Sequence, residues 1–207
     1  MEVNFKKHWE KVYFSKEPHQ VSWTQDTPQT SLDFIQTFEL KKTSKIIDVG
    51  GGDSKFVDHL LDAGFENVHV LDISGKALEK AQKRLGERAA LVKWIESDIR
   101  EFAPETTYDV WHDRALFHFL TDKNDIKKYR EIVDQCVSKY LTVGTFSNNG
   151  PEACSGLQVK QYNERELTEV FKPRFDKLQC FTRDHITPSG SVQNFMFCSF
   201  KRIDSLF

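Results

Sequence analysis

Residues 45–54 read KIIDVGGGDS, and this stretch decides the fold of the chain. Two branched apolar residues, an aspartate and a valine predict a strand, which Gly50, Gly51 and Gly52 follow directly. Glycines leave backbone N–H groups free at the start of the next helix and place no Cβ atom in the way of a ligand. The stretch therefore predicts a site for a nucleotide-type cofactor pressed against the main chain.

From this turn outward, short apolar runs alternate with amphipathic helical segments. The expected strands are residues 45–49, 67–73, 91–97, 108–113 and 140–147, and the expected helices are 54–64, 75–86 and 124–137. Ser74 is placed to cap the second of these helices, and Gly64 and Gly86 are placed to end the first two. Such alternation is typical of βα units on a parallel sheet.

The last third of the chain has a different pattern. Asn163, followed three residues later by Glu166, predicts a capped helix. Residues 175–186 and 191–203 then alternate apolar and polar side chains on either side of TPSG, which favours an antiparallel hairpin at the sheet edge.

The sequence of residues 48–54, DVGGGDS, resembles the first motif of the class I S-adenosylmethionine-dependent methyltransferases, acidic-x-G-x-G-x-G, with Ser54 in place of the last glycine. A dinucleotide fingerprint would instead need a small residue at position 55, where the chain has Lys55. Asp72, Asp98 and YDVWHD at 108–113 follow in the order found in the same family, so the resemblance covers about residues 45–147.

This resemblance implies an α/β fold with a Rossmann-like, doubly wound, mostly parallel sheet of about seven strands. A C-terminal antiparallel hairpin and an N-terminal helical flap would complete it. The length of 207 residues favours a single domain. We expect a flap or lid at residues 1–40, a cofactor-binding core at 41–147, and a helix with the hairpin at 148–207.

The resemblance also implies S-adenosyl-L-methionine as cofactor and S-adenosyl-L-homocysteine as product. Asp48 and the glycine turn Gly50, Gly51 and Gly52 would lie near the methionine end. Asp72, beside Ile73, would accept hydrogen bonds from the ribose hydroxyls. Asp98, beside Ile99, would bind the adenine amine. Simple turn or capping roles for these aspartates are the alternative.

His112 and Asp113 end the fourth expected strand, at the edge where parallel sheets bind ligands. We therefore expect one of them to orient the methyl acceptor or to take its proton, with His8 or His19 of the flap as possible helpers. His and Asp residues show no metal-ligand spacing, so we expect no metal.

Residues 111–122, WHDRALFHFLTD, resemble the stretch after the fourth strand in thiopurine and related thiol methyltransferases, and also that of some protein lysine methyltransferases. We favour a small-molecule acceptor (a thiol, an amine or a carboxylate-containing metabolite) over a protein lysine. A non-catalytic cofactor-binding or scaffold protein is the alternative of another class. Residues 1–40 and the 147–162 loop are expected to select the substrate.

Composition narrows the partners and the location. A net charge of −2 with dispersed basic residues disfavours nucleic acid as a partner, and no apolar run is long enough to cross a membrane. The first residues lack a secretory signal pattern, so we expect a cytoplasmic protein. The four cysteines form no C-x-x-C pair and are expected to be free and mostly buried: Cys136, Cys154, Cys180 and Cys198. The oligomeric state is not indicated.

Overall fold

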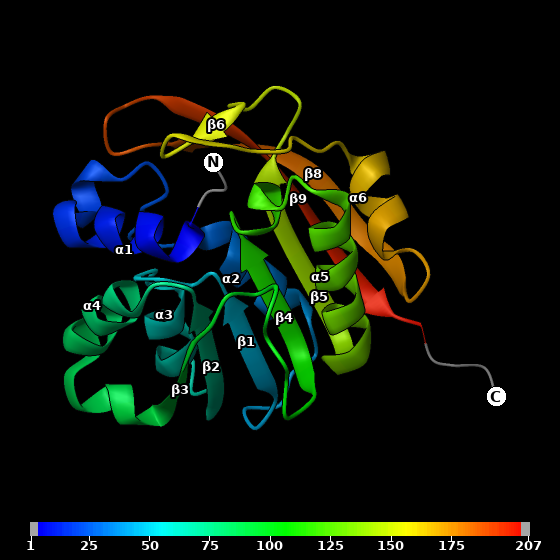
Figure 1. Cartoon of the computed structure of the whole chain (residues 1–207). Helices are drawn as coiled ribbons and strands as arrows, with labels where there is room; N and C mark the ends of the chain where they lie inside the picture. Colours follow the sequence, from blue (N-terminus) through cyan, green and yellow to red (C-terminus); the bar gives the residue numbers. More distant parts are fainter. Residues whose placement is uncertain (1–3, 204–207) are drawn as a thin grey trace.

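The computed structural model describes residues 4–203 and is built on a seven-stranded sheet (Figure 1). From one edge to the other the strands are β3 (Val92–Glu96), β2 (Asn67–Asp72), β1 (Lys45–Val49), β4 (Tyr108–Arg114), β5 (Val137–Phe146), β9 (Val192–Arg202) and β8 (Phe175–Ile186). The first five are parallel, and β9 runs antiparallel to both β5 and β8. This is the Rossmann-like sheet with a C-terminal antiparallel hairpin that the sequence predicts.

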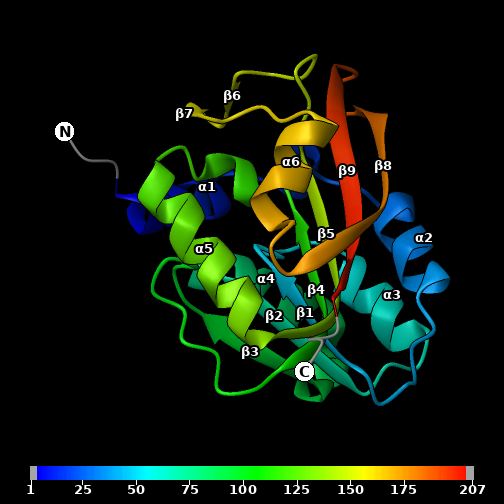
Figure 2. The same cartoon turned by 90° about the vertical axis from the view of Figure 1, so that its right-hand side faces the viewer.

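Helices cover both faces of the sheet (Figure 2). They are α1 (Phe5–Ser15), α2 (Gln29–Thr37), α3 (Phe56–Asp62), α4 (Gly75–Leu85), α5 (Lys123–Cys136) and α6 (Glu164–Phe171), with short 3₁₀ turns at Pro18–Gln20, Gly86–Leu91 and Phe117–Phe119. The Ser74 side chain caps α4, and Gly86 ends it with a φ of 60°. Local chemistry therefore sets the helix ends where the sequence predicts them.

Two apolar layers hold the helices to the sheet, because successive strand residues point to opposite faces. Ile46 and Val110 pack with α2, α3 and α4, whereas their neighbours Ile47 and Trp111 pack with α5 and α6. All four of these strand residues are fully buried. Nearly continuous apolar strands are what a parallel sheet covered on both faces needs.

The first 40 residues divide between the core and the cover of the sheet edge. Phe34 and Ile35 of α2 belong to the apolar layer beneath the sheet. Helix α1 instead lies beside α4, where the Lys6 ammonium pairs with Glu96 at 2.6 Å and the Lys80 ammonium donates to the Lys16 carbonyl at 2.7 Å. The part of the expected flap that covers the sheet edge is thus α1 and the segment after it, while α2 is part of the core.

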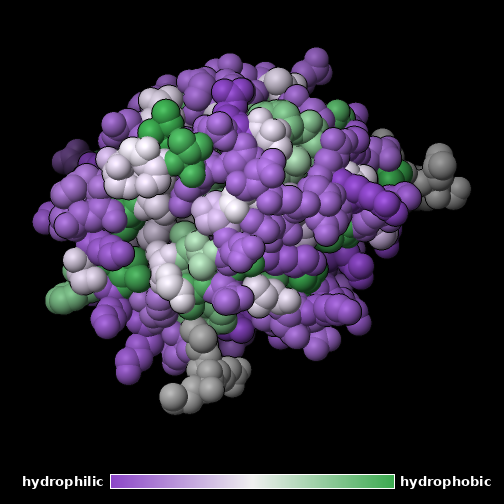
Figure 3. All heavy atoms as spheres, turned by 90° about the horizontal axis from the view of Figure 1, so that it is seen from above, coloured by the Kyte–Doolittle hydropathy of each residue, from purple (hydrophilic) through white to green (hydrophobic). Residues whose placement is uncertain are grey.

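Residues 147–156, expected to be a loop, contain the first half of a small hairpin. Its strands are β6 (Ala153–Cys154) and β7 (Leu157–Gln158), joined through Ser155 and Gly156, both with positive φ. Seen from above, where this hairpin lies, the molecule is mostly hydrophilic and its apolar atoms form small separate groups (Figure 3). Among residues 4–203, no helix is long and apolar enough to cross a membrane.

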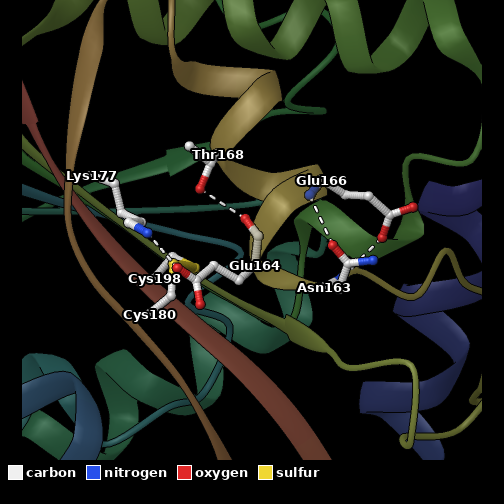
Figure 4. Close-up of a disulfide and its surroundings, with 7 residues drawn as sticks. All are labelled: Asn163, Glu164, Glu166, Thr168, Lys177, Cys180 and Cys198. Atoms are coloured by element: carbon white, nitrogen blue, oxygen red, sulfur yellow. Dashed lines mark hydrogen bonds and ion pairs between the residues drawn. A yellow bond between two sulfur atoms is a disulfide. The ribbon is translucent and has the colours of Figure 1, made fainter.

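The expectation of four free cysteines is wrong for two of them. Cys180 of β8 and Cys198 of β9 are directly opposite each other in the antiparallel pairing and form a disulfide (Figure 4). Cys136 and Cys154 are free and buried, as expected. Sequence spacing alone does not show strand register, which is what brings the two sulfur atoms together. Figure 4 also shows the predicted α6 cap, in which Asn163 and Glu166 exchange side-chain hydrogen bonds with each other's backbone.

We expect denatured, unreduced protein to expose two titratable thiols and reduced protein to expose four, because one disulfide joins two of the four cysteines. A thiol titration in denaturant, with and without prior reduction, checks this. A Cys180→Ser variant, in which three thiols should react without reduction, is the control. Four thiols in the unreduced wild-type protein would contradict the pairing.

Candidate active site

The glycine turn after β1 is tightly enclosed by side chains. A Cβ atom on Gly50, where φ is +68°, would lie 2.7 Å from Leu116. A Cβ atom on Gly52, where φ is +51°, would lie 2.5 Å from the Tyr13 hydroxyl oxygen. Both positions therefore exclude other residues by backbone conformation and by space. The N–H groups of Gly50 and Gly51 donate to the Leu71 carbonyl, which holds the turn against β2.

A cavity opens above this turn, at the carboxyl ends of β1, β2 and β4. Strands β2 and β4 leave β1 on opposite sides, so this is the point where the strand order reverses, the usual ligand site of such sheets. The lining includes Asp48, Gly50, Gly51, Asp72 and Ile73 from the strand ends and the turn, and Tyr13 and Trp23 from the N-terminal cover. A smaller adjoining cavity shares Trp9, Ile73, Leu116 and Phe119 and is also lined by Ser97, Asp98 and Ile99. The two cavities together bring all the residues predicted for cofactor binding to one edge, with Gly52 held in the turn itself.

Asp72, the last residue of β2, is a buried acid whose pKa is shifted far from its usual value. It is 6% exposed, and its Oδ1 accepts a hydrogen bond from the Ser74 N–H at 2.8 Å. Burial, reinforced by the nearby charges of Asp48 and Asp53, raises its pKa to about 7. Burial also raises the pKa of Asp53, against the charge of Arg84. A site lined by three carboxylates favours a ligand that carries a positive charge or offers hydroxyl donors.

Asp98 has a partner that the sequence did not reveal. The Arg100 guanidinium donates to both of its carboxylate oxygens, at 3.0 Å from Nε to Oδ1 and 2.6 Å from Nη2 to Oδ2. Burial acts to raise the pKa of Asp98, but the hydrogen bonds and charge of Arg100 outweigh it and the net pKa is lowered. Arg100 also lies over the Phe5 ring of α1, 4.9 Å from its centroid. This acid therefore links the small cavity to the cover.

His112 lies beneath the large cavity with both ring nitrogens engaged. Its Nδ1 donates to Asp48 Oδ1 at 2.7 Å, because the carboxylate only accepts, and its Nε2 accepts from the Ser31 hydroxyl at 2.7 Å. The series resembles a Ser-His-Asp triad in connectivity. Ser31, however, is 1% exposed on α2 and does not line either cavity, so it does not act as a nucleophile. The series instead joins α2 to the ends of β1 and β4.

Asp113 does not reach the cavity, contrary to the expectation that it lines the site with His112. Consecutive strand residues point to opposite faces, so Asp113 points toward α5. Its Oδ2 accepts from the Tyr129 hydroxyl at 2.7 Å, and its Oδ1 accepts from the N–H groups of Leu116 and Phe117. Burial raises its pKa to about 6, against these hydrogen bonds. Asp113 therefore holds the turn that follows β4.

Several cavity residues were not identified from the sequence. Arg114 is the last residue of β4 and lines the large cavity, as do Cys154 and Gln193. Trp9 and Trp23 of the expected flap form an aromatic cluster over it with Phe119, with ring centroids 5.6 Å apart for the two tryptophans and 5.1 Å apart for Trp9 and Phe119. The sequence signal for Arg114 was its place in the run at 111–122 that resembles other methyltransferases, directly after the fourth expected strand. His8 and His19 do not line either of the two cavities.

Comparison with known proteins identifies the central segment. Residues 46–137 match a family model described as a methyltransferase domain. The mouse protein eEF1A lysine and N-terminal methyltransferase is 24% identical over 123 residues, 58% of this chain and 17% of its own length. Malonyl-[acyl-carrier protein] O-methyltransferase 1 of Ilyobacter polytropus is 33% identical over 85 residues, 40% of this chain and 31% of its own length. The chain thus spans less than a third of either relative.

The fold also matches solved structures. The N-methyltransferase NodS of Bradyrhizobium japonicum WM9, in complex with S-adenosyl-L-homocysteine, superimposes with a TM-score of 0.74 at 14% identity. The alignment covers 98% of this chain and all of that one, at 100%. At this identity the likeness concerns the fold, and it confirms the Rossmann-like architecture expected from the sequence.

The raised pKa of Asp72 predicts that its ionised carboxylate destabilises the folded, ligand-free protein. The folded protein binds this proton more tightly than the unfolded chain, whose Asp pKa is about 3.9, so stability falls as pH rises from about 4 to about 7. We expect Asp72→Asn to exceed the wild type in free energy of unfolding by on the order of 2–4 kcal/mol at pH 8, and to differ little at pH 4. Urea unfolding of ligand-free protein across this range measures it. Exposed Asp176 provides the control, Asp176→Asn, and an Asp72→Asn gain independent of pH would count against the assignment.

The hydrogen-bonded series Ser31–His112–Asp48 predicts that truncating His112 lowers the free energy of unfolding more than truncating Ser31. His112→Ala leaves the buried Asp48 carboxylate without its partner, which we expect to lower the free energy of unfolding by about 3–5 kcal/mol. Ser31→Ala removes one hydroxyl bond and should cost about 1 kcal/mol. Denaturant titrations of both variants test the order. Equal costs would mean that Asp48 does not depend on the imidazole.

Proposed function

Given that residues 46–137 are a methyltransferase domain on a Rossmann-like sheet, we propose that this protein transfers a methyl group from S-adenosyl-L-methionine to a small-molecule acceptor. The observation that carries the proposal is the meeting of three features in one cavity: a glycine turn that excludes Cβ atoms, a buried carboxylate after β2, and an aromatic cover. Each supports one part of a nucleoside-type ligand with a positively charged sulfur.

The residues fit the parts of this cofactor in order. We assign the methionine end to Asp48 and to the turn Gly50, Gly51 and Gly52, where the main chain is approachable. We assign the ribose hydroxyls to Asp72.

The adjoining small cavity is assigned to the adenine ring. Ile73 and Ile99 line it as apolar surfaces, and Asp98 lies beside them. Arg100 donates to Asp98 from its backbone N–H, from Nη2 and from an Nε shared between both oxygens, so we propose that the adenine amine replaces the longest of these contacts, Nε to Oδ2 at 3.1 Å. The smaller cavity adjoins the larger and shares lining residues with it, so we propose that one extended ligand occupies both.

S-Adenosyl-L-methionine, when bound, supplies a methyl group on a sulfonium; the S–CH₃ bond breaks with its electron pair staying on sulfur, and the acceptor's lone pair forms the new bond. The protein has to align the acceptor and exclude water. The cover formed by Tyr13, Trp23 and the cluster around them is placed for both tasks. We propose that His112 positions Asp48 beneath the reacting groups, because its two ring nitrogens are held by Asp48 and by the buried Ser31 hydroxyl rather than directed at an acceptor. A proton released by the acceptor leaves to water.

A small acceptor is favoured over a protein side chain by how the cavity is covered. Its lining includes Pro18, Ser22 and Trp23 of the N-terminal segment, Cys154 of the β6–β7 hairpin and Gln193 of β9. These residues come from the two segments expected to select the substrate and from the hairpin of β8 and β9. A cover made of three chain segments suits a metabolite that is enclosed.

Protein lysine methylation is the second candidate, favoured by the names of several relatives and by the aromatic cluster, which could surround an alkylammonium group. The buried cation Arg114 in the same cavity opposes it, because two positive charges would meet in a desolvated space. A non-catalytic cofactor-binding protein remains the candidate of another class.

We expect calorimetric titration to show micromolar binding of S-adenosyl-L-methionine and S-adenosyl-L-homocysteine, and no binding of NAD. Asp72→Ala should weaken both affinities at least 10-fold, since each lost charge-assisted hydrogen bond contributes roughly 1.5–3 kcal/mol. Affinity should also rise with pH up to about 7, as Asp72 loses its proton, and this dependence should be absent in the variant.

Exposed Asp176→Ala is the control for that titration and should bind like the wild type. Binding by wild type without any loss in Asp72→Ala would remove the ribose assignment. Failure of wild type to bind either sulfur compound would refute the proposed function.

A further inference from the structure

Arg114 is a buried cation whose hydrogen-bonding capacity is largely unused. Its Nη1 donates to the Trp23 carbonyl at 2.9 Å. Its Nε and Nη2 atoms are inaccessible to solvent and have no hydrogen-bond partner among residues 4–203. These two nitrogens share one edge of the planar guanidinium, the edge that binds a carboxylate with two parallel hydrogen bonds. Arg114 also lines the large cavity, so a ligand there reaches that edge once the guanidinium turns from its closed position toward the cavity.

No acidic side chain among the described residues pairs with this charge. The two other cations that line the cavity are paired: Lys55 with Asp26 at 2.6 Å, and Arg84 with Asp58 at 2.7 Å. The acid that acts on Arg114 is Asp48, whose Oδ1 is bonded to His112. Burial lowers the pKa of Arg114 to about 10, so it stays protonated at neutral pH. A desolvated positive charge without a counter-ion is costly unless a ligand supplies one.

The neighbours of Arg114 are neutral rather than acidic. Burial, with the charge of Arg114 as a further cause, lowers the pKa of both His118 and His185. The His118 Nδ1 accepts from the Phe146 N–H, and the His185 ring bonds to the Ser22 carbonyl. The local field on this side of the cavity is therefore positive, in contrast to the three carboxylates on the other side.

The position of Arg114 separates it from the expected cofactor groups. Its guanidinium carbon lies 5.3 Å from the ring centroid of Phe195 in β9. Strand β9 is three places from β1 in the sheet, roughly 14 Å at about 4.8 Å per strand, whereas Asp72 ends β2 on the other side of β1. Arg114 thus extends toward the acceptor side of the cavity, beside Gln193 and the Trp23 segment.

We propose that the Nε and Nη2 edge of Arg114 binds a carboxylate of the methyl acceptor, which makes the substrate a small carboxylic acid. The carboxylate serves as the anchor, because both of its oxygens accept hydrogen bonds from the fork, and a second nucleophilic atom receives the methyl group. A monoanion fits better than a phosphate dianion, because one cation faces it and Asp48, Asp53 and Asp72 line the same cavity. This inference rests on the proposed methyltransferase function and narrows its substrate class.

The test uses full-length protein saturated with S-adenosyl-L-homocysteine and titrated calorimetrically with matched probes. Benzoate, phenylacetate and 3-phenylpropionate are each compared with the corresponding amide, and phenylphosphonate serves as the dianion probe. We expect at least one carboxylate to bind at least 10-fold more tightly than its amide. Arg114→Gln should abolish the preference for the carboxylate over the amide. Arg114→Lys keeps the positive charge but not the two parallel N–H donors, and should retain part of this preference. In both variants the affinity for S-adenosyl-L-homocysteine should change less than 2-fold.

Arg183→Gln is the matched control, because Arg183 also lies over a phenylalanine ring, 5.7 Å from the Phe181 centroid, but is exposed on β8. It should bind the probes like the wild type. Equal binding of acids and amides, no saturable binding of any carboxylate, or tighter binding of the phosphonate would each overturn the inference. Loss of S-adenosyl-L-homocysteine affinity in Arg114→Gln would also overturn it, because that result would assign the edge to the cofactor. Absence of S-adenosyl-L-homocysteine binding in wild type is a different outcome, because it refutes the proposed function itself.

Discussion

The buried carboxylate of Asp48, at the end of β1, is the constraint on which the rest of the site depends. Its Oδ2 lies 2.5 Å from the place of a Cβ atom on Gly51, so that position has to be glycine. Its Oδ1 holds His112 of β4, and through His112 the Ser31 hydroxyl of α2. One side chain thus determines the glycine turn, the junction of two parallel strands, and the seat of the helix beneath them. A buried charge of this kind is tolerated because its partners are in place.

Different parts of the sheet provide the stability of the protein and the groups of the candidate site. The two apolar layers, with Ile46 and Val110 on one face of the sheet and Ile47 and Trp111 on the other, provide the burial that stabilises the fold. The edge above them concentrates groups that are unfavourable in a folded protein, such as a protonatable Asp72 and an Arg114 without an acidic partner among residues 4–203. Perturbed acids and unpaired donors gathered in one cavity are what a ligand site requires.

The cover over this edge is attached differently from the core. Helix α1 is held by the Lys6–Glu96 pair, which is largely exposed, by the carbonyl contact of Lys80, and by aromatic contacts of Trp9 and Tyr13. Exposed ion pairs contribute little to stability. Helix α2, in contrast, is packed into the apolar layer through Phe34. The change from contacts at the sheet edge to packing in the apolar layer therefore falls between these two helices, within the segment that carries Trp23.

The sequence by itself determined the alternation of strands and helices, the helix ends at Ser74 and Gly86, the glycine turn, and the placement of Asp72 after β2. Each follows from local chemistry: side-chain periodicity, capping, and the freedom of glycine to adopt positive φ. It also placed His112 and Asp113 together at one strand end. Only the tertiary structure decided that His112 turns to the cavity side and Asp113 to α5, because the face of a strand is set by what packs against it.

The same limit applies to contacts between distant segments. The Cys180–Cys198 bond depends on the register of β8 against β9. The Nε and Nη2 atoms of Arg114 have no hydrogen-bond partner among residues 4–203, and this depends on where the fold places Trp23, Phe195 and the acids of the cavity. Local propensity acts over a few residues, whereas an unpaired charge is defined by everything that comes near it in three dimensions. That is why the fold and the position of the glycine turn could be inferred from the sequence, while the surroundings of Arg114 required the structure.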